Sequence, residues 1–453
     1  MTAERPTLAR LAADLASGAV SATDLTEACL DIIDAEDGQG RAAFVHVDRA
    51  GARIAAKAVD KMRESGAALS PFAGIPIAIK DLFDVAGQVT RAGSKVLNGP
   101  PARADAVAVR RLRQAGFILI GRSNMTEFAF SGLGLNPHYG TPLSPWRRNE
   151  KRISGGSTSG GAAAVADGMA HAALGTDTGG SCRIPAAWCG LVGFKPTAAR
   201  IAREGVTPLS TTLDSVGSIA RSVDCIAAFD AILTGKAPKE LVSRDLTGMR
   251  FARIENIVCD GADKSVVQAY ERALGAIKKS GARITKVSLE PFDRIAAINA
   301  KGGFAAAESF AWHRRLLETR EAEYDPRVAS RIKRGSGQSA ADYIDLLAAR
   351  AALMSDAAEA LDSYDAMLMP TTPIAPPLLT DLADDEAYGR INLLALRNPM
   401  LINMIDGCAV SLPMHLPGDA PSGLMIACLS GQDRKLLALA KAVESALSGA
   451  ARS

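Results

Sequence analysis

Residues 174–197 read LGTDTGGSCRIPAAWCGLVGFKPT, and their order predicts a strand, a tight turn and a helix. The overlapping residues MAHAALGTD are expected to form the strand that enters the turn. Pro185 suits the first turn of the following helix, where its missing N–H costs no hydrogen bond. Ser181 comes directly after two glycines. The stretch therefore predicts a serine nucleophile held in a backbone cradle where a strand meets a helix.

The two glycines before this serine give the turn a second use. Glycine allows φ values that turn successive N–H groups inward, so the amides of Thr178, Gly179, Gly180 and Ser181 can face one point. A carbonyl oxygen carries negative charge at such a point during acyl transfer, which makes these amides a candidate oxyanion hole. The alternative is a phosphate-binding loop, but neither GxxxxGK[ST] nor GxGxxG occurs around this segment.

Strands and helices alternate on both sides of this segment. Residues 72–81 predict a buried strand that ends at Lys80, and residues 104–121 predict a helix followed by the strand FILI. Residues 249–288 read as a βαβ unit. Only a short linker-like stretch, 234–248, separates these pieces. We therefore predict an α/β fold with a single large mixed twisted β-sheet, flanked on both sides by α-helices.

Composition argues against several classes of protein. The chain has 453 residues and a net charge of +3 from 52 basic and 49 acidic residues, so neither a nucleic-acid surface nor a polybasic membrane patch is indicated. Seven cysteines without a CxxC pair indicate neither a disulfide framework nor a zinc ribbon, and they fit a reducing cytosol. No signal-peptide core and no run of roughly 18 apolar residues occurs. We expect a cytoplasmic protein without a membrane segment.

A serine hydroxyl is a weak nucleophile at neutral pH and needs a base within hydrogen-bonding distance. Any histidine of the chain is a candidate, although none is close to Ser181 in sequence: His46, His138, His171, His313 and His415. A lysine can replace histidine if burial lowers its pKa enough to leave part of the amine neutral. Lys80 and Lys195 have the most apolar flanks. Each is a candidate base or, alternatively, a lysine whose ammonium reaches solvent from a strand end.

Three blocks of sequence resemble the amidase signature family, the serine hydrolases with a Ser–Ser–Lys triad. The blocks are AGIPIAIKDLFDVAG (73–87), the pair GGSTSGGAAAVADG (155–168) and 174–197, and a tail that begins MLMPTTPIAPP (367–428). The resemblance covers most of the chain and thins between about 235 and 360. It implies a single amidase signature domain over 1–453, with a catalytic core at 65–230 and a variable specificity region at 235–360.

The resemblance assigns roles to residues that match the family's motifs. Ser181 matches the nucleophile, Lys80 matches the base, and Ser157 matches the serine that bridges them. The same resemblance implies a cis peptide bond between Gly156 and Ser157. Ser159 is close by but matches a position usually held by glycine or serine, so it is the weaker candidate for the bridge.

Further residues are expected around this triad. Asp177 and Arg183 match fixed members of the block, and we interpret them as supports of the loop rather than as substrate ligands. The family's loop arrangement implies that Met125, Phe128 and residues around 130–140 line the substrate pocket. The alternative for the stretch NMTEF is packing in the core.

The activity implied is that of an amidohydrolase, which cleaves the C–N bond of a small carboxamide through a serine acyl-enzyme and needs no metal or organic cofactor. The alternative is the glutamine-hydrolysing A subunit of a tRNA-dependent amidotransferase, although residues 308–332 resemble general amidases instead. A catalytically silent scaffold is a third interpretation, and the intact triad argues against it. The expected partner is a small-molecule amide, without direct nucleic-acid contact, and the chain could form a homodimer.

Overall fold

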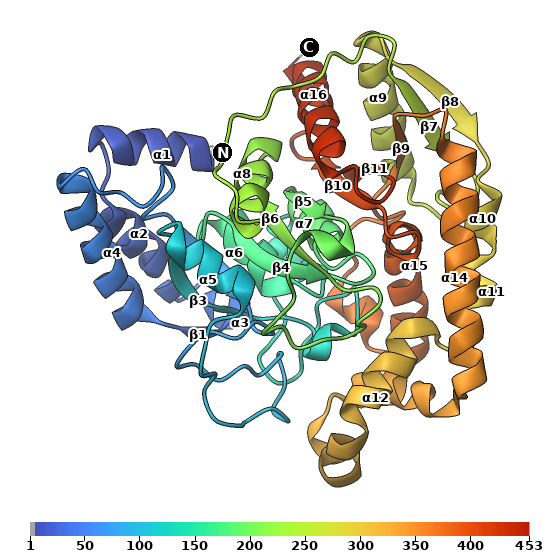
Figure 1. Ribbon diagram of the computed structural model, residues 1–453, viewed down its shortest axis with the longest axis horizontal. Coiled ribbons are helices and arrows are strands. Elements are labelled where there is room, and N and C mark those ends of the chain that lie inside the picture. The colour runs from blue at the N-terminus through green and yellow to red at the C-terminus, as the bar shows by residue number, and fades with distance from the viewer. Residues whose placement is uncertain (1–4, 453) are drawn as a thin grey trace.

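The computed structural model describes residues 5–452, and one β-sheet of eleven strands runs through these residues (Figure 1). The strands lie in the order β1-β3-β2-β4-β6-β5-β10-β11-β9-β7-β8. Their bounds are β1 (Phe44–Val47), β2 (Pro76–Lys80), β3 (Ile118–Ser123), β4 (Ala173–Asp177), β5 (Val192–Lys195), β6 (Ser215–Ala220), β7 (Arg250–Ile254), β8 (Arg283–Val287), β9 (Ala366–Pro370), β10 (Cys408–Pro413) and β11 (Gly423–Cys428). The prediction of a single large sheet is confirmed.

Strand directions in this sheet are mixed, as the sequence predicts. Parallel pairing joins β2 to β3 and to β4, and it joins β7 to β8 and to β9. The other neighbouring strands run antiparallel. The parallel pair of β7 and β8 is the βαβ unit predicted for residues 249–288, with α9 as its crossover.

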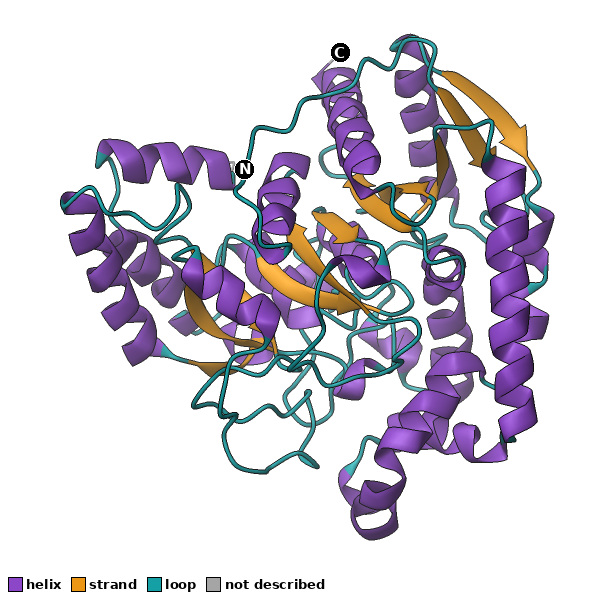
Figure 2. Cartoon of the chain, in the orientation of Figure 1, coloured by secondary structure: helices purple, strands orange, loops and turns teal. Residues whose placement is uncertain are grey.

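Helices surround the strands, and Figure 2 shows them on both sides of the sheet. Their bounds are α1 (Leu8–Ser17), α2 (Ala22–Asp34), α3 (Gly40–Ala43), α4 (Arg49–Glu64), α5 (Val107–Gln114), α6 (Ser159–Asp167), α7 (Arg183–Cys189), α8 (Val223–Leu233), α9 (Lys264–Lys279), α10 (Glu290–Asp293), α11 (Ile295–Ile298), α12 (Gly303–Arg320), α13 (Pro326–Lys333), α14 (Ala340–Leu361), α15 (Asp385–Met404) and α16 (Asp433–Arg452). Pro185 lies in the first turn of α7, as predicted.

Small residues let helix α6 approach its neighbours closely. Its sequence is SGGAAAVAD, and its first seven residues are all buried. A Cβ atom at Gly160 would overlap the carbonyl oxygen of Ala43 and the backbone nitrogen of Asn124. The glycine therefore lets α6 pack directly against the backbone behind the central strands, which positions the loop that precedes it.

The connection between α8 and β7 contains no helix or strand in the described part of the chain, and it matches the linker predicted at 234–248. It does not divide the sheet. Strands from before it (β5) and after it (β10) are paired, with Phe194 opposite Val410. Helix α16, which follows the connection, packs against α8, which precedes it. Both segments therefore contribute to one layered body (Figure 1).

Candidate active site

Lys80 ends strand β2, which lies between β3 and β4 in the sheet. Its side chain is fully buried. The Nζ atom donates a hydrogen bond to Ser157 Oγ at 2.8 Å and another to Thr176 Oγ1 at 2.9 Å. The structure thus brings together a lysine and a serine that are far apart in sequence, in a place without solvent.

Burial changes the charge state of this lysine. Removal from water disfavours the ammonium form and lowers the pKa of Lys80 to about 8, although the carboxylates of Asp177 and Asp214 partly oppose the change. An amine with this pKa is neutral in about one molecule in ten at pH 7. Lys80 can therefore act as a base near neutral pH, which an exposed lysine does only rarely.

Ser157 lies in the glycine-serine loop just before α6. The peptide bond between Gly156 and Ser157 is cis. The next N–H, that of Thr158, donates to the carbonyl oxygen of Ser181 at 3.2 Å, so the two serine loops are adjacent. Ser159 is the first residue of α6, and its buried hydroxyl has no partner within residues 5–452. Of the two candidate bridging serines, Ser157 is the one in contact with Lys80.

Ser181 lies in the turn between β4 and α7, and the Asp177 carboxylate shapes this turn. Its oxygens accept hydrogen bonds from the N–H groups of Gly180 at 2.9 Å and Cys182 at 3.1 Å. Arg183 holds the same carboxylate with Nε at 3.0 Å and Nη2 at 2.8 Å. Burial alone would raise the pKa of Asp177, but the Arg183 guanidinium holds it well below its usual value. Asp177 and Arg183 thus contact the turn itself.

The four amides proposed as an oxyanion hole are not equivalent. The N–H of Gly180 donates to Asp177, so it supports the turn, contrary to the expectation that it faces the substrate. Within the described residues, the N–H groups of Thr178, Gly179 and Ser181 have no acceptor, and all three residues line a cavity. These three amides are therefore free to bind a ligand.

Two residues of this site carry no motif of their own. Asp214 accepts the hydroxyl hydrogen of Thr178, and burial raises the pKa of Asp214 to about 6. Asn403 donates to Asp177 Oδ1 at 3.1 Å and accepts from Arg183 Nη2 at 2.6 Å. Both lie in segments similar to the family, PLSTTLDSVGSIARSV and NMIDGCAVSLP, which was the only sequence signal for them.

The other candidate bases lie away from Ser181, and the adjacent Cys182 is not suited to replace it as the nucleophile. Within residues 5–452, no histidine forms a hydrogen bond with Ser181. Burial raises the pKa of the Cys182 thiol to about 12, so it remains protonated at neutral pH. Lys195 is also buried, but its Nζ donates to the carbonyl oxygens of Pro196 and Gly407. The histidine neighbours are Glu127 for His138, Cys29 for His171, Tyr324 for His313 and Ser422 for His415, while His46 is exposed on β1.

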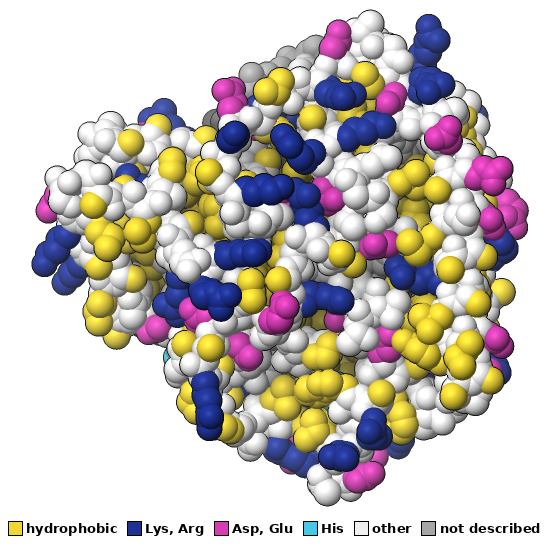
Figure 3. Space-filling view, viewed as in Figure 1, with side chains coloured by type: hydrophobic (Ala, Val, Ile, Leu, Met, Phe, Trp, Pro, Cys, Tyr) yellow, Lys and Arg dark blue, Asp and Glu magenta, His cyan; other side chains and the backbone are white. Residues whose placement is uncertain are grey.

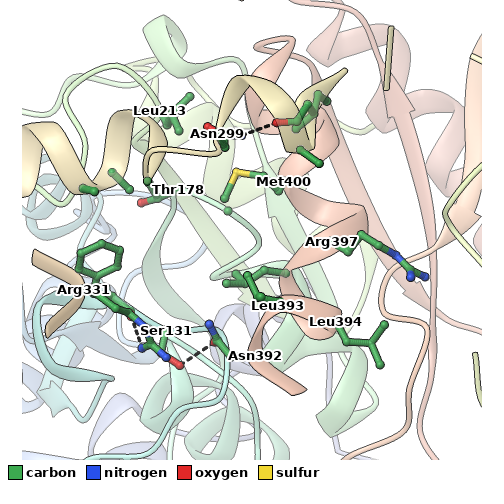
Figure 4. Close-up of a pocket in the computed structure, with 18 of the residues that line it drawn as sticks. Ser131, Thr178, Leu213, Asn299, Arg331, Asn392, Leu393, Leu394, Arg397 and Met400 are labelled. Carbon is green, nitrogen blue, oxygen red and sulfur yellow. Dashed lines mark hydrogen bonds between the residues drawn. The ribbon is translucent and has the colours of Figure 1, made fainter. Parts of the chain in front are cut away.

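A cavity of about 1100 Å³ opens beside the turn that carries Ser181. Ser181 is 3% exposed and lines the cavity together with Thr178 and Gly179. Figure 4 shows that α15 forms a long part of the wall, from Asn392 to Met400. The rest of the wall comes from residues within 129–131, 209–213, 257–261 and 292–306, together with Arg331 and Arg334. The cavity is mostly apolar, with a few arginine and amide side chains.

Two residues expected in this cavity do not line it. Met125 and Phe128 are buried in the core. Phe128 has a φ of 49°, and its ring lies 4.3 Å from that of His313 and 6.1 Å from that of Trp312. The chain turns at this point, so the residues that follow, Ala129 to Ser131, reach the cavity. The alternative of core packing for NMTEF describes the structure.

Metal ligands, membrane-spanning helices and surface charge were the other features that the sequence raised. Within the described chain, His, Cys, Asp and Glu side chains form no group of three or more that could hold a metal ion. No helix among residues 5–452 is long and apolar enough to cross a membrane. On the face in Figure 3, acidic and basic side chains are interspersed, as the small net charge predicts.

Comparison with known proteins agrees with this geometry. The sequence model of the family Amidase matches residues 24–437. The 2-amino-5-chloromuconic acid deaminase of Comamonas testosteroni is 34% identical, over 88% of this chain and 87% of that protein. The A subunit of the glutamyl-tRNA(Gln) amidotransferase of Streptomyces coelicolor is 33% identical, over 97% and 95%. A crystal structure of an amidase has a TM-score of 0.88 at 32% identity, over 97% of this chain and 99% of that one. This chain therefore belongs to the amidase family and is a hydrolase that acts on amide C–N bonds.

Proposed function

We propose that the enzyme hydrolyses a small carboxamide through an acyl-enzyme on Ser181, with Ser157 and Lys80 as the proton relay. One observation carries this proposal. The Nζ atom of Lys80, a fully buried lysine with a lowered pKa, lies 2.8 Å from the hydroxyl oxygen of Ser157. The loop that contains Ser157 is in turn hydrogen-bonded to the turn that contains Ser181. A structural lysine would gain little from such a place, because burial of an ammonium without a carboxylate partner is costly.

The relay follows from the order of the groups. Neutral Lys80 accepts a proton from Ser157, which accepts one from Ser181 as this oxygen attacks the amide carbonyl. The tetrahedral oxyanion faces the amides of Gly179 and Ser181, and Thr178 completes the candidate oxyanion hole. Ser157 then donates a proton to the leaving nitrogen and takes back the proton held by Lys80, which is neutral again. Water cleaves the acyl-enzyme by the same steps in reverse and regenerates Ser181.

Fixed groups around the turn support this chemistry. Asp177, which Arg183 and Asn403 hold in place, accepts the hydrogen bond of the Gly180 N–H. This contact fixes the turn and so orients the neighbouring amides. Asp214 fixes the side chain of Thr178. Donors that are positioned before the reaction stabilise the developing charge without reorganisation during it. We therefore propose that these residues position the oxyanion hole and do not touch the substrate.

The relatives named above suggest two uses of such a site. One acts on an amino-muconic acid and the other belongs to a tRNA-dependent amidotransferase. Most of the cavity beside Ser181 is apolar, which favours a small organic amide as the substrate of the isolated enzyme. A glutamine-hydrolysing component of an amidotransferase is the second candidate, because identity to the Streptomyces coelicolor relative extends over 97% of this chain.

The test is an ammonia-release assay with the purified chain on aliphatic, aromatic and urea-like amides, with glutamine included. We expect turnover of at least one small amide without any partner protein. Ser181→Ala or Ser157→Ala should lower kcat by about a thousandfold or more. Ser159→Ala is the matched control, because Ser159 lies two residues away at the start of α6 and its hydroxyl has no hydrogen bond within residues 5–452. Full activity of Ser181→Ala would contradict the proposal, and turnover of glutamine alone would favour the second candidate function.

A further inference from the structure

One wall of the cavity presents two groups of hydrogen-bond donors, the NH2 group of Asn392 and the guanidinium of Arg331. Asn392 on α15 accepts at its Oδ1 atom from the Ser131 hydroxyl at 2.8 Å and from the Gly132 N–H at 2.9 Å. The Tyr388 hydroxyl in turn donates to Ser131 Oγ at 2.8 Å. Since its oxygen is engaged by two donors, the orientation of the Asn392 amide is fixed. Its NH2 group has no acceptor within residues 5–452 and is therefore available to donate to a ligand in the cavity.

Arg331 on α13 lies on the same wall, and Figure 4 shows its guanidinium near Ser131 and Asn392. Its Nη1 atom donates to the carbonyl oxygen of Phe130 at 2.9 Å, and its guanidinium lies 4.9 Å from the centre of the Tyr388 ring. No carboxylate of the described residues forms an ion pair with it. The guanidinium is thus held in place on one side, and its other donors and its charge are not neutralised.

The balance of charge around the cavity points the same way. Four arginines line it, against two acidic residues: Arg331, Arg334, Arg390 and Arg397, with Glu386 and Asp293. Beside Asn392 the wall is aliphatic, with Leu393, Leu394 and Leu396. A guanidinium and an amide NH2 on an otherwise apolar wall match an anion with two oxygens, because such an anion accepts several charge-assisted hydrogen bonds at once.

This wall lies close to the turn that carries Ser181. Leu396 lies between the two, because Cβ atoms at Gly132 and Gly179 would be 3.0 and 3.5 Å from its Cδ2 atom. Asn392 lies four residues before Leu396 on α15, a rise of about 6 Å along the axis.

We propose that the substrate is a carboxamide with a carboxylate at its far end, bound by Arg331 and the Asn392 amide while the amide group lies at Ser181. The inference rests on the proposed amide hydrolysis at that serine and adds the class of substrate. Arg331 and Asn392 are specificity-determining residues in this proposal, and they take no part in proton transfer.

The test compares each half-amide of a dicarboxylic acid with the neutral amide of the same length, such as glutaramic acid with pentanamide. We expect the wild-type enzyme to favour the acid in kcat/KM by at least tenfold. Arg331→Met should lower kcat/KM for the acid by about 10- to 100-fold, the usual loss for a hydrogen bond to a charged group, and leave the neutral amide within a few-fold. The ratio of the two substrates is the readout, because a purely structural role would lower both.

Two further variants sharpen this comparison. Asn392→Asp keeps an oxygen for Ser131 and Gly132 but adds a negative charge, so it should reduce the acid selectively. Arg327→Met is the matched control, because Arg327 lies on the same helix and over the same Tyr388 ring at 4.4 Å but does not line the cavity. Its ratio should equal that of the wild type. The pair N-acetyl-β-alanine and N-propylacetamide shows whether the carboxylate belongs to the leaving amine instead.

Binding of glutarate, measured by calorimetry on Ser181→Ala, separates this inference from the proposed reaction. Binding that weakens in Arg331→Met and Asn392→Asp but persists in Arg327→Met supports the carboxylate site even if no amide is turned over. An absence of turnover would then count against the relay alone. Equal rates on acid and neutral amides in both pairs, or parallel losses in Arg331→Met, would overturn the inference.

Discussion

At the scale of single residues, the chemistry depends on the charge of one amine. Lys80 is buried next to two hydroxyls and a carbonyl oxygen, with the nearest carboxylates acting only through space. Its lowered pKa leaves a usable fraction of neutral amine at neutral pH. In the proposed mechanism, Lys80 therefore takes the role that the imidazole of a histidine has in most serine hydrolases.

The pH dependence of the rate should follow this titration. Only neutral Lys80 can accept a proton, so kcat/KM should rise with pH and reach half of its plateau near the pKa of about 8. Initial rates on a neutral amide between pH 6 and 10 measure this profile. A profile that is flat across this range, or one that falls, would show that another group is the base.

Lys195 provides the control for this profile. Burial lowers its pKa to about 8 as well, but its Nζ atom donates to two carbonyl oxygens away from the serines. Lys195→Met loses these two hydrogen bonds and should be less stable, yet its remaining activity should keep the same half-point. A shift of the half-point in that variant would assign the titration to Lys195.

At the scale of elements, small residues decide how closely helix α6 packs against its neighbours. Helix α6 places its backbone against Ala43 and Asn124, which a larger residue at position 160 would prevent. Because the loop with Ser157 leads directly into α6, the position of this helix also sets the position of the bridging serine.

Two glycine substitutions test this packing. Gly160→Ala should lower the free energy of unfolding by about 1–3 kcal/mol, because the added methyl group overlaps rigid backbone atoms. Gly275→Ala in α9 is the matched control, since a Cβ there meets no atom within 4 Å. It should raise the free energy of unfolding by up to about 1 kcal/mol, as alanine favours helices. Urea denaturation of both variants measures the difference, and a stable Gly160→Ala protein would refute the packing argument.

At the scale of the whole molecule, strands from both ends of the chain form the same sheet. The pairing of β5 with β10 joins the segment before the 234–248 connection to the segment after it. The prediction of a single domain over the whole chain therefore requires that the two segments stay associated in solution.

A cut in this connection gives that measurement. Limited trypsin treatment should cleave at exposed Lys236 or Lys239, which lie in the loop. The two fragments should stay together, because the β5–β10 ladder and the packing of α16 on α8 do not depend on the peptide bond. Denaturing gels should therefore show two bands, while size-exclusion chromatography shows one peak at the volume of the uncut protein. Separate elution would indicate two independent units.

The way in which the fold brings distant segments together also explains which features could be predicted from the sequence. Residues 174–197 and the strand at 72–81 were predictable because glycine, proline and apolar runs act locally. The cavity was not, because its wall comes from segments that only the fold brings together, such as Ser131, Arg331 and Asn392. The prediction that Phe128 lines the cavity was wrong for a related reason. Phe128 and Ala129 both have positive φ values, and this sharp bend of the chain places Phe128 in the core and Ala129 at the cavity.

Helix α15 has a consequence for attempts to change what this enzyme accepts. It presents Asn392 to the cavity, and further along, Asn403 to the Arg183–Asp177 pair. A shift or rotation of α15 that makes room for a bulkier ligand would also disturb the contacts of Asn403 with Asp177 and Arg183, which support the turn that carries Ser181. Selectivity and speed are thus mechanically linked, and directed evolution toward new amides should collect its compensating changes along this helix.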